Sequence, residues 1–226
     1  MLDTLDIDPG VPPAATLIVL HGLGADGNDF VPICDELDLT AIGPVRFVFP
    51  HAPVRPVTIN GGHAMRAWYD ILGLGGRSPE DEPGLRQSIA DIEALLAREQ
   101  ARGVPASRTV LMGFSQGCAM SLLAGLRHPS RLAGIVGLSG YLPLADTLAA
   151  ERSAANADVP VFMAHGRHDD VVNIARGQQA RDTLAGLGYG VEWHDYAMPH
   201  SVCAEEVADL NAWLLKVLTA ASQGQG

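Results

Sequence analysis

The chain is poor in basic residues and in cysteine. Of its 226 residues, 15 are lysine or arginine and 26 are aspartate or glutamate, which gives a formal net charge of −11. Binding to nucleic acid or to an anionic membrane surface needs basic patches, so this charge argues against both kinds of partner. The cysteines Cys34, Cys118 and Cys203 are odd in number and scattered. This usage fits reduced thiols better than a disulfide framework, so we predict a cytoplasmic location.

Long hydrophobic runs are missing too. No segment approaches the roughly 20 apolar residues of a transmembrane helix, so no integral membrane association is expected. Residues 1–6 carry no basic group ahead of a long apolar run, which argues against a secretory signal peptide. The metal-binding patterns H-E-x-x-H and C-x-x-C do not occur. We therefore expect neither a metal nor another cofactor.

What remains is an ordinary globular composition, with 47% hydrophobic and 18% charged residues. A chain of this length can bury a substantial core as one domain, which we predict over residues 1–226. Within it, residues 1–15 are interpreted as an exposed lead-in or a short edge strand. Residues 219–226 are predicted to form a frayed tail. The sequence does not distinguish a monomer from a homodimer.

Apolar strands and amphipathic helices alternate along the chain, which predicts an α/β fold with a mainly parallel central sheet and helices on both faces. Continuous apolar runs of the kind that parallel strands need set the sheet. Strands are expected at 16–20, 45–50, 109–112, 132–138 and 159–164, with a strand nearer the edge at 191–196. Helices are expected at 82–102, 118–126, 173–187 and 202–218.

The stretch 51–80 has no clear period and contains several prolines and glycines. An irregular stretch of this length inside a compact domain is usually functional. We expect one short strand in it, around residues 65–69.

The organising motif is Gly113-Phe114-Ser115-Gln116-Gly117, between an apolar strand and a helical pattern of small residues. This is the G-x-S-x-G nucleophile elbow in the setting that it requires. Ser115 must occupy a sharp, strained turn so that its hydroxyl projects clear of the sheet. Side chains two residues to either side would collide there, so both positions are glycine. The following helix directs its positive end toward any negative charge that forms beside Ser115.

A serine hydroxyl needs a base to activate it and an acid to orient that base. Reactive groups in a parallel sheet gather at the carboxyl ends of its strands. Asp169 follows the strand that ends at Ala164, and His200 follows the strand that ends at Tyr196. The order Ser115, Asp169, His200 is that of α/β-hydrolases. These three residues are therefore the predicted catalytic set.

Other acids and histidines leave alternatives. Asp170 is adjacent to Asp169 and is a second candidate for the acid, whereas Asp195 lies within a strand and is interpreted as a surface residue. His168 is a rival base only if its loop folds back toward Ser115. The remaining histidines are interpreted as structural: His21 and His165 through bonds to loop backbone, and His51, His63, His128 and His194 as surface or satisfied core residues.

Acyl transfer also needs hydrogen-bond donors for the oxyanion of the tetrahedral intermediate. One donor is expected from the backbone N–H of Gln116, the residue after the nucleophile. The other is expected from the glycine-containing loop 21–24, where we nominate the N–H of Leu23; a plain glycine turn is the alternative.

Several motifs together resemble the carboxylesterase/phospholipase family that includes the acyl-protein thioesterases. They span about residues 16–218 and occur in the right order: His21-Gly22-Leu23-Gly24, Ala67-Trp68-Tyr69-Asp70, Gly113-Phe114-Ser115-Gln116-Gly117, His165-Gly166-x-x-Asp169 and Tyr196-x-Met198-x-His200. The resemblance implies the α/β-hydrolase fold without a large cap domain. It also implies the roles already assigned to Ser115, Asp169, His200, Leu23 and Gln116.

The resemblance further implies that the loop after Asp70 borders the groove for the acyl group. Leu72 and Leu74 give that loop an apolar surface, although they could instead pack inward. Trp68 is a further candidate for the groove wall, with burial in the core as the alternative.

The resulting hypothesis is a cofactor-free serine hydrolase of carboxylic esters or thioesters, acting through an acyl-enzyme. Short- to medium-chain esters, lysophospholipids and acylated protein thiols all remain open as substrates. A dienelactone-hydrolase-like enzyme is a poorer match because that chemistry uses cysteine at the elbow. The alternative from another class is a non-catalytic protein that binds a small ligand on the same fold.

Overall fold

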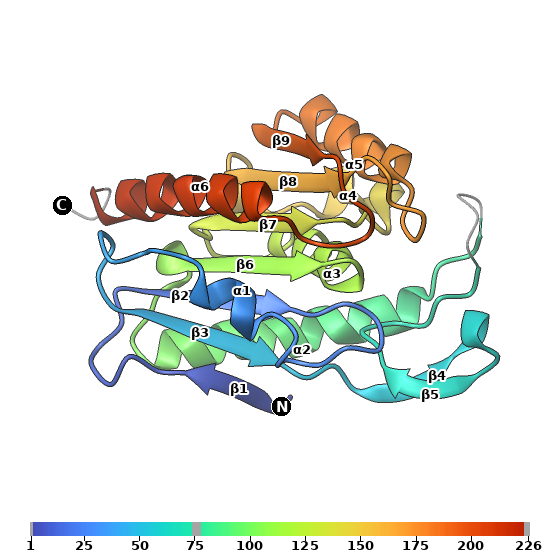
Figure 1. Cartoon of the computed structure of the whole chain (residues 1–226), viewed down its shortest axis with the longest axis horizontal. Coiled ribbons are helices and arrows are strands. Elements are labelled where there is room, and N and C mark those ends of the chain that lie inside the picture. Colours follow the sequence, from blue (N-terminus) through green and yellow to red (C-terminus); the bar gives the residue numbers. More distant parts are fainter. Residues whose placement is uncertain (1, 74–77, 224–226) are drawn as a thin grey trace.

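A mainly parallel sheet runs through the centre of the molecule (Figure 1). The computed structural model describes residues 2–73 and 78–223. Across these residues seven strands join in one sheet, in which β1 alone runs antiparallel to its neighbour. In sheet order the strands are β1 (Thr4–Ile7), β3 (Val45–Pro50), β2 (Ala15–Leu20), β6 (Thr109–Phe114), β7 (Gly134–Leu138), β8 (Val161–Gly166) and β9 (Val191–Tyr196).

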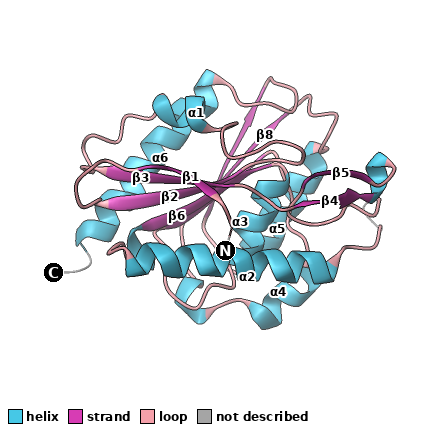
Figure 2. Cartoon of the chain, turned by 90° about the horizontal axis from the view of Figure 1, so that it is seen from below, coloured by secondary structure: helices cyan, strands magenta, loops and turns pink. Residues whose placement is uncertain are grey.

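Helices cover both faces of this sheet, as Figure 2 shows. One face carries α2 (Glu82–Ala101), α3 (Gln116–Gly125), α4 (Ala145–Glu151) and α5 (Ile174–Gly186). The other carries α1 (Val31–Asp35) and α6 (Ala204–Gln223). The predicted α/β architecture is therefore confirmed.

The sheet separates two hydrophobic cores, and β2 contributes to both. Ile18 and Leu20 point into the core on the α2 and α3 side, whereas Leu17 and Val19 point into the core on the α6 side. Successive side chains of a strand face opposite ways, so a strand covered on both faces needs apolar residues at every position. This requirement explains why the central strands are continuous apolar runs.

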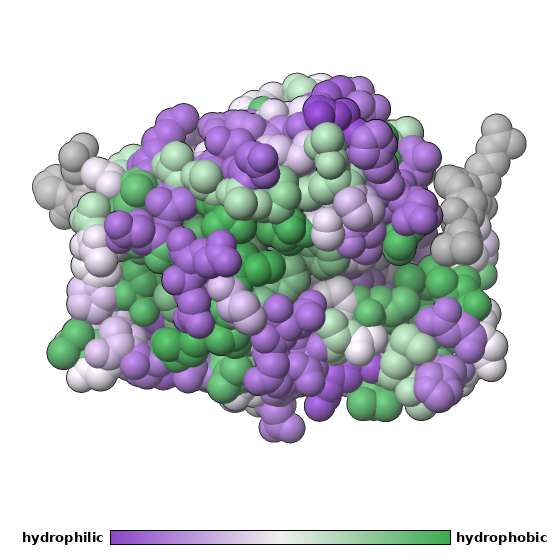
Figure 3. All heavy atoms as spheres, in the orientation of Figure 1, coloured by the Kyte–Doolittle hydropathy of each residue, from purple (hydrophilic) through white to green (hydrophobic). Residues whose placement is uncertain are grey.

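Helix α5 belongs to the outer layer of the molecule. Ala180 and Leu184 are buried against the sheet, and Gly177 lies close to the ring of His165. The rest of the helix presents mostly polar residues, and the surface above it is largely hydrophilic (Figure 3).

A separate hairpin extends from one end of the sheet (Figure 1). It consists of β4 (Val54–Val57) and β5 (His63–Arg66), joined through the short 3₁₀ helix η1 (Thr58–Asn60). The short strand expected around 65–69 corresponds to β5, displaced toward the N-terminus. Its partner β4 was not predicted because Pro56 breaks the strand pattern; proline is accommodated here in a two-stranded ribbon that has only edges.

The two ends of the chain differ from expectation in one respect. Within 1–15, β1 forms the edge strand that was one of the two readings of this segment. The prediction of a frayed tail is wrong for 219–223, because α6 continues to Gln223; residues 224–226 lie outside the described range. Ala221 still packs against the α6-side core, and alanine favours the helix.

Within the described ranges, none of the helices combines the length and the apolar character needed to cross a membrane.

Candidate active site

Ser115 lies at a strained turn between β6 and α3. Its φ of 56° and ψ of −115° are unfavourable for a residue with a side chain, and its N–H donates to the Leu138 carbonyl over 2.8 Å. A Cβ at Gly113 would overlap the Gly117 carbonyl, and one at Gly117 would overlap the Leu20 carbonyl. The two glycines thus permit the close packing that holds the turn, as the sequence predicts.

The Ser115 hydroxyl belongs to a continuous hydrogen-bonded chain with His200 and Asp169. His200 Nε2 lies 3.0 Å from Ser115 Oγ, and His200 Nδ1 lies 2.6 Å from Asp169 Oδ2. The three residues follow β6, β9 and β8, whose parallel carboxyl ends lie at one edge of the sheet. Because a carboxylate only accepts hydrogen bonds, Nδ1 carries a proton and Nε2 is left to accept the serine proton.

Asp169 is held by the backbone that follows it. Its Oδ1 accepts hydrogen bonds from the N–H groups of Val171 and Val172, at 2.9 and 2.7 Å, and its side chain is fully buried. These bonds leave Oδ2 facing His200. The adjacent Asp170 is exposed, so of the two candidate acids only Asp169 contacts the histidine.

His21 and His165 bind loop backbone. Nδ1 of His21 donates to the Gly22 carbonyl at 2.7 Å and Nε2 accepts from the Ala52 N–H at 3.0 Å. Nε2 of His165 lies 2.7 Å from the Val172 carbonyl and 3.3 Å from Asp169 Oδ2. Burial lowers the pKa of both imidazoles. Each ring fixes a loop beside the site, while the ring of the rival base His168 is exposed.

The His200 ring also packs on an aromatic neighbour. The centroids of the Phe114 and His200 rings are 4.7 Å apart, and Phe114 is supported by Phe30 with a centroid distance of 5.5 Å. Phe114, which directly precedes Ser115, thus restrains the imidazole of His200. Nothing in the sequence indicated this role, since the contact joins residues far apart in the chain.

Two backbone N–H groups close to Ser115 in the chain or in space have no protein acceptor among the described residues. Gly22, next to Leu23, approaches so closely that a Cβ there would lie 3.3 Å from Ser115 Cβ. Gln116 is the first residue of α3, where an N–H has no acceptor in its own helix. No hydrogen bond from the N–H of Leu23 or Gln116 is present among the residues described. Both donors are available to a negatively charged oxygen.

The Gln116 side chain holds the preceding loop in place. Its Oε1 accepts from the Trp68 N–H and its Nε2 donates to the Tyr69 carbonyl, each at 2.8 Å. Glutamine is suited to this because one amide supplies both a donor and an acceptor. The sequence contains both Gln116 and the Trp-Tyr-Asp segment, but only the structure shows that the glutamine side chain bonds to the backbone of that segment.

The suggestion that Trp68 lines the substrate groove is wrong. Its side chain is 0% exposed and lies in the core, where its indole N–H donates to the His21 carbonyl at 2.9 Å. A tryptophan with its N–H satisfied inside the protein has no surface to offer a ligand. Trp68 instead ties the Gln116-bound loop to the His21 loop.

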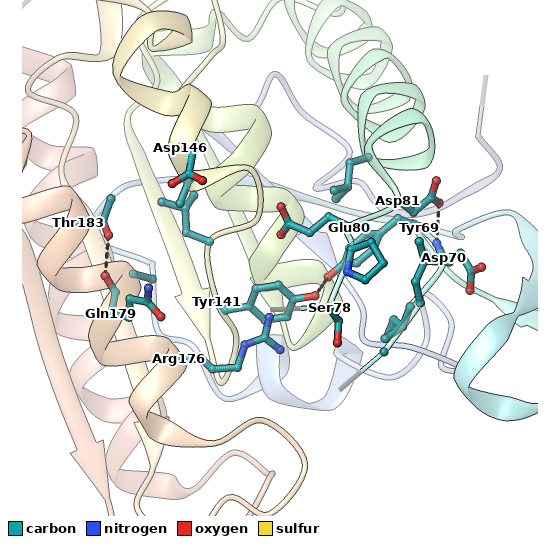
Figure 4. Close-up of a pocket in the computed structure, with 18 residues that line it drawn as sticks. Tyr69, Asp70, Ser78, Glu80, Asp81, Tyr141, Asp146, Arg176, Gln179 and Thr183 are labelled. Carbon is teal, nitrogen blue, oxygen red and sulfur yellow. Dashed lines mark hydrogen bonds between the residues drawn. The ribbon is translucent and has the colours of Figure 1, made fainter. Parts of the chain in front are cut away.

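A pocket of about 390 Å³ lies beside the loop that the Gln116 side chain holds (Figure 4). Tyr69, whose carbonyl is bound by Gln116, lines it together with Tyr141, and the two hydroxyls are 2.7 Å apart. Leu72 lies on its wall and is 40% exposed, so it does not pack inward. Leu74, also predicted to border the groove, lies outside the described residues.

Known proteins resemble this chain over most of its length. A family model described as Phospholipase/Carboxylesterase matches residues 6–218. The chain is 42% identical over 237 residues to acyl-protein thioesterase 1 of Mycosarcoma maydis, with 97% of this chain and 99% of that protein covered. It is 40% identical over 205 residues to acyl-protein thioesterase 1 of Yarrowia lipolytica, covering 88% and 90%.

Among solved structures, acyl-protein thioesterase 2 of Zea mays matches with a TM-score of 0.85 and 31% identity, covering 96% of this chain and 100% of that one. The family match and the two relatives extend over nearly the whole chain, and the solved structure shares its fold. The chain therefore belongs to the phospholipase/carboxylesterase family of α/β-hydrolases and is a hydrolase.

Proposed function

We propose that this chain is a serine hydrolase that cleaves carboxylic esters and thioesters through an acyl-enzyme intermediate. The observation that carries the proposal is the hydrogen-bonded chain from Ser115 Oγ through His200 to Asp169, with lengths of 3.0 and 2.6 Å. An unassisted serine is a weak nucleophile, and this arrangement supplies the base and the orienting acid that it needs.

In the proposed reaction, His200 Nε2 accepts the hydroxyl proton as Ser115 Oγ attacks the substrate carbonyl carbon. The carbonyl oxygen becomes an oxyanion that accepts hydrogen bonds from the Leu23 and Gln116 N–H groups. Collapse of the intermediate breaks the bond to the leaving group, which takes the proton from His200. Water then attacks the acyl-enzyme by the same steps and releases the carboxylic acid and the free serine. Asp169 stays ionised throughout and stabilises the imidazolium.

The proposed substrates are small acyl esters and acylated thiols, including acyl groups on protein cysteines. The relatives named acyl-protein thioesterase 1 support the thioester assignment. The pocket beside Tyr69 supports an acyl site, because the Tyr69 carbonyl is bound to the Gln116 side chain and Leu72 lies on the pocket wall. A thiolate is a better leaving group than an alkoxide. Residues that can cleave an ester, here Ser115, His200 and Asp169, can therefore also cleave a thioester.

Substitution of the proposed nucleophile tests the assignment. We expect Ser115→Ala to abolish labelling by a fluorophosphonate and to reduce kcat for a short p-nitrophenyl ester by about 10⁶-fold, with the fold retained. Ser139→Ala is a control, because Ser139 also has a positive φ, of 50°, and directly follows the neighbouring strand β7, while its side chain is buried. This control should still be labelled.

Labelling that persists in Ser115→Ala would place the nucleophile elsewhere. A folded wild-type protein that is neither labelled nor hydrolyses the ester would favour the alternative of a non-catalytic ligand-binding protein.

A further inference from the structure

A positively charged side chain lines the pocket beside Tyr69 and Tyr141. Arg176, in the first turn of α5, is half-buried, and its guanidinium carbon lies 3.4 Å from the centre of the Tyr141 ring. Figure 4 shows the guanidinium along this ring, facing the pocket. Of the described lining residues, Arg176 is the one that carries positive charge.

Arg176 has no anionic partner within the described parts of the chain. None of the ion pairs between described residues involves Arg176, whereas Arg181 of the same helix pairs with Asp182. Residues 74–77, which lie outside the described ranges, have the sequence Leu-Gly-Gly-Arg and contain no carboxylate that could neutralise it. The charge is therefore available to a ligand.

Two acidic residues of the pocket, Asp70 and Asp81, are bound by neighbouring hydrogen-bond donors. Asp70 accepts hydrogen bonds from the Thr58 N–H and hydroxyl, and Asp81 accepts from the N–H groups of Asp70 and Gly84. In Figure 4 both carboxylates lie beyond Tyr69, away from the guanidinium.

Two further acids complete this part of the lining. Glu80 accepts from the Leu144 N–H at 3.0 Å, and Asp146 is exposed in the first turn of α4. Glu80 thereby fixes a loop, and Asp146 faces water. Neither acid forms an ion pair with Arg176.

The pocket also offers a hydroxyl donor. Tyr69 and Tyr141 share one hydrogen bond of 2.7 Å, which uses one of their two hydroxyl protons and leaves the other free. A guanidinium stacked on an aromatic ring keeps its edge N–H groups free for a carboxylate. An alkyl chain pressed against these groups would remove their water and replace no hydrogen bond, which is unfavourable.

We propose that this pocket receives an acyl group whose far end carries a carboxylate, and that Arg176 determines this specificity by pairing with it. The inference rests on the proposed hydrolase function and narrows its substrate class to ω-carboxyacyl esters and thioesters. Hydrolysis would then yield a dicarboxylic acid and the free alcohol or thiol. A volume of about 390 Å³ is in the range of small-ligand sites.

The test compares acyl thioesters of N-acetylcysteamine in matched pairs. Glutaryl, adipoyl and pimeloyl thioesters are each paired with the neutral isostere in which a terminal isopropyl group replaces the carboxylate. We expect the wild type to favour the charged member of at least one pair by about tenfold in kcat/KM, the scale of one charge-assisted pair that is partly exposed. This preference should weaken as ionic strength rises.

Substitutions then assign the preference to one residue. Arg176→Met should abolish it while hydrolysis of the neutral thioesters continues, and Arg176→Lys should retain part of it, because lysine keeps the charge but not the planar fork. Arg181→Met is the matched control, since Arg181 lies on the same helix, pairs with Asp182 and stacks on Trp193 outside the pocket. It should leave the ratio unchanged.

Two results would overturn the inference alone: preference for the neutral member in every pair, or an unchanged ratio in Arg176→Met. Failure of the wild type to hydrolyse any thioester and to react with a fluorophosphonate would instead overturn the proposed function, and the inference with it.

Discussion

Two buried carboxylates at different places in this molecule have different kinds of hydrogen-bond partner. Asp169, beyond the carboxyl end of β8, and Glu99, near the end of α2, both have side chains with 0% exposure. Asp169 accepts hydrogen bonds from two backbone N–H groups and the imidazole of His200, and its Oδ2 also lies 3.3 Å from His165 Nε2. Glu99 is bonded by the guanidinium groups of Arg46, Arg98 and Arg102 and by the Thr16 hydroxyl.

The difference lies in what the partner can do. A histidine gains and loses a proton near neutral pH, so the carboxylate beside it can stabilise a charge that appears during a reaction. Arginine stays charged at any pH at which a protein is folded, so its pairs do not change during a reaction. Burial alone therefore does not identify a catalytic acid; the chemistry of its partner does.

The Glu99 cluster, which we define as Glu99 with Arg46, Arg98 and Arg102, links three elements of the fold through ion pairs. It joins α2 to β3 through Arg46, and Arg98 and Arg102 extend it to Asp6 of β1. This explains how a strand at the sheet edge, formed by only four residues, is attached to the body of the protein.

The largest effect that separates the two carboxylates is expected from Asp169→Asn. The amide keeps the shape but offers a donor where His200 Nδ1–H needs an acceptor, which favours the wrong imidazole tautomer. We expect kcat to fall by about 10⁴-fold. Activity on a p-nitrophenyl ester measures the loss. The exposed neighbour supplies the control, since Asp170→Asn should change kcat less than about twofold; similar losses in both variants would contradict the assignment.

The converse change is Glu99→Gln, which should affect stability and leave the chemistry intact. It leaves the buried Arg46 without its main counter-charge, and losing one member of a buried pair costs about 3–5 kcal/mol. Urea unfolding measures this change, with kcat assayed below the transition. Asp182→Asn removes one member of an exposed ion pair with Arg181 and should cost less than about 0.5 kcal/mol. An equal loss of unfolding free energy in the two variants would show that the ion pairs of Glu99 do not stabilise the fold.

Much of the Asp169 region was predictable from sequence because its requirements are local. The elbow needs glycines around Ser115, and a parallel sheet brings the residues after its strands to one edge. These two rules are enough to nominate Ser115, Asp169 and His200 from their places after predicted strands.

The Glu99 region was not predictable, and neither were the supports of the site. Glu99 reads as one more polar residue of a helix, and its partner Arg46 is 53 residues away in the chain. The contacts of Gln116 with Trp68 and of Phe114 with His200 likewise join distant segments. Side-chain contacts of this kind depend on how the layers pack, which no local pattern encodes.

A third buried carboxylate, Glu206 of α6, sharpens the comparison because it has neither kind of partner. No described residue donates a hydrogen bond of ordinary geometry to either of its oxygens. Burial raises its pKa from 4.5 to about 8, against a smaller lowering by the backbone of Cys203. The unfolded chain therefore releases this proton near pH 4.5, whereas the folded chain keeps it up to about pH 8. Between these values the unfolded state binds fewer protons, so the free energy of unfolding falls as the pH rises.

Glu206→Gln should remove this pH dependence, because the amide resembles the protonated acid and does not ionise. We expect the wild type to lose up to about 1.4 kcal/mol of stability per pH unit through this one group, and the variant to be the more stable protein at pH 8. Urea unfolding between pH 5 and 8 measures the difference. Glu205→Gln, an exposed neighbour in the same helical turn, should leave the slope unchanged. Parallel stability curves for wild type and Glu206→Gln would mean that Glu206 is ionised inside the protein. An ionised carboxylate there would need hydrogen-bond donors or a positive charge, as Asp169 and Glu99 have, and the described residues supply neither to Glu206.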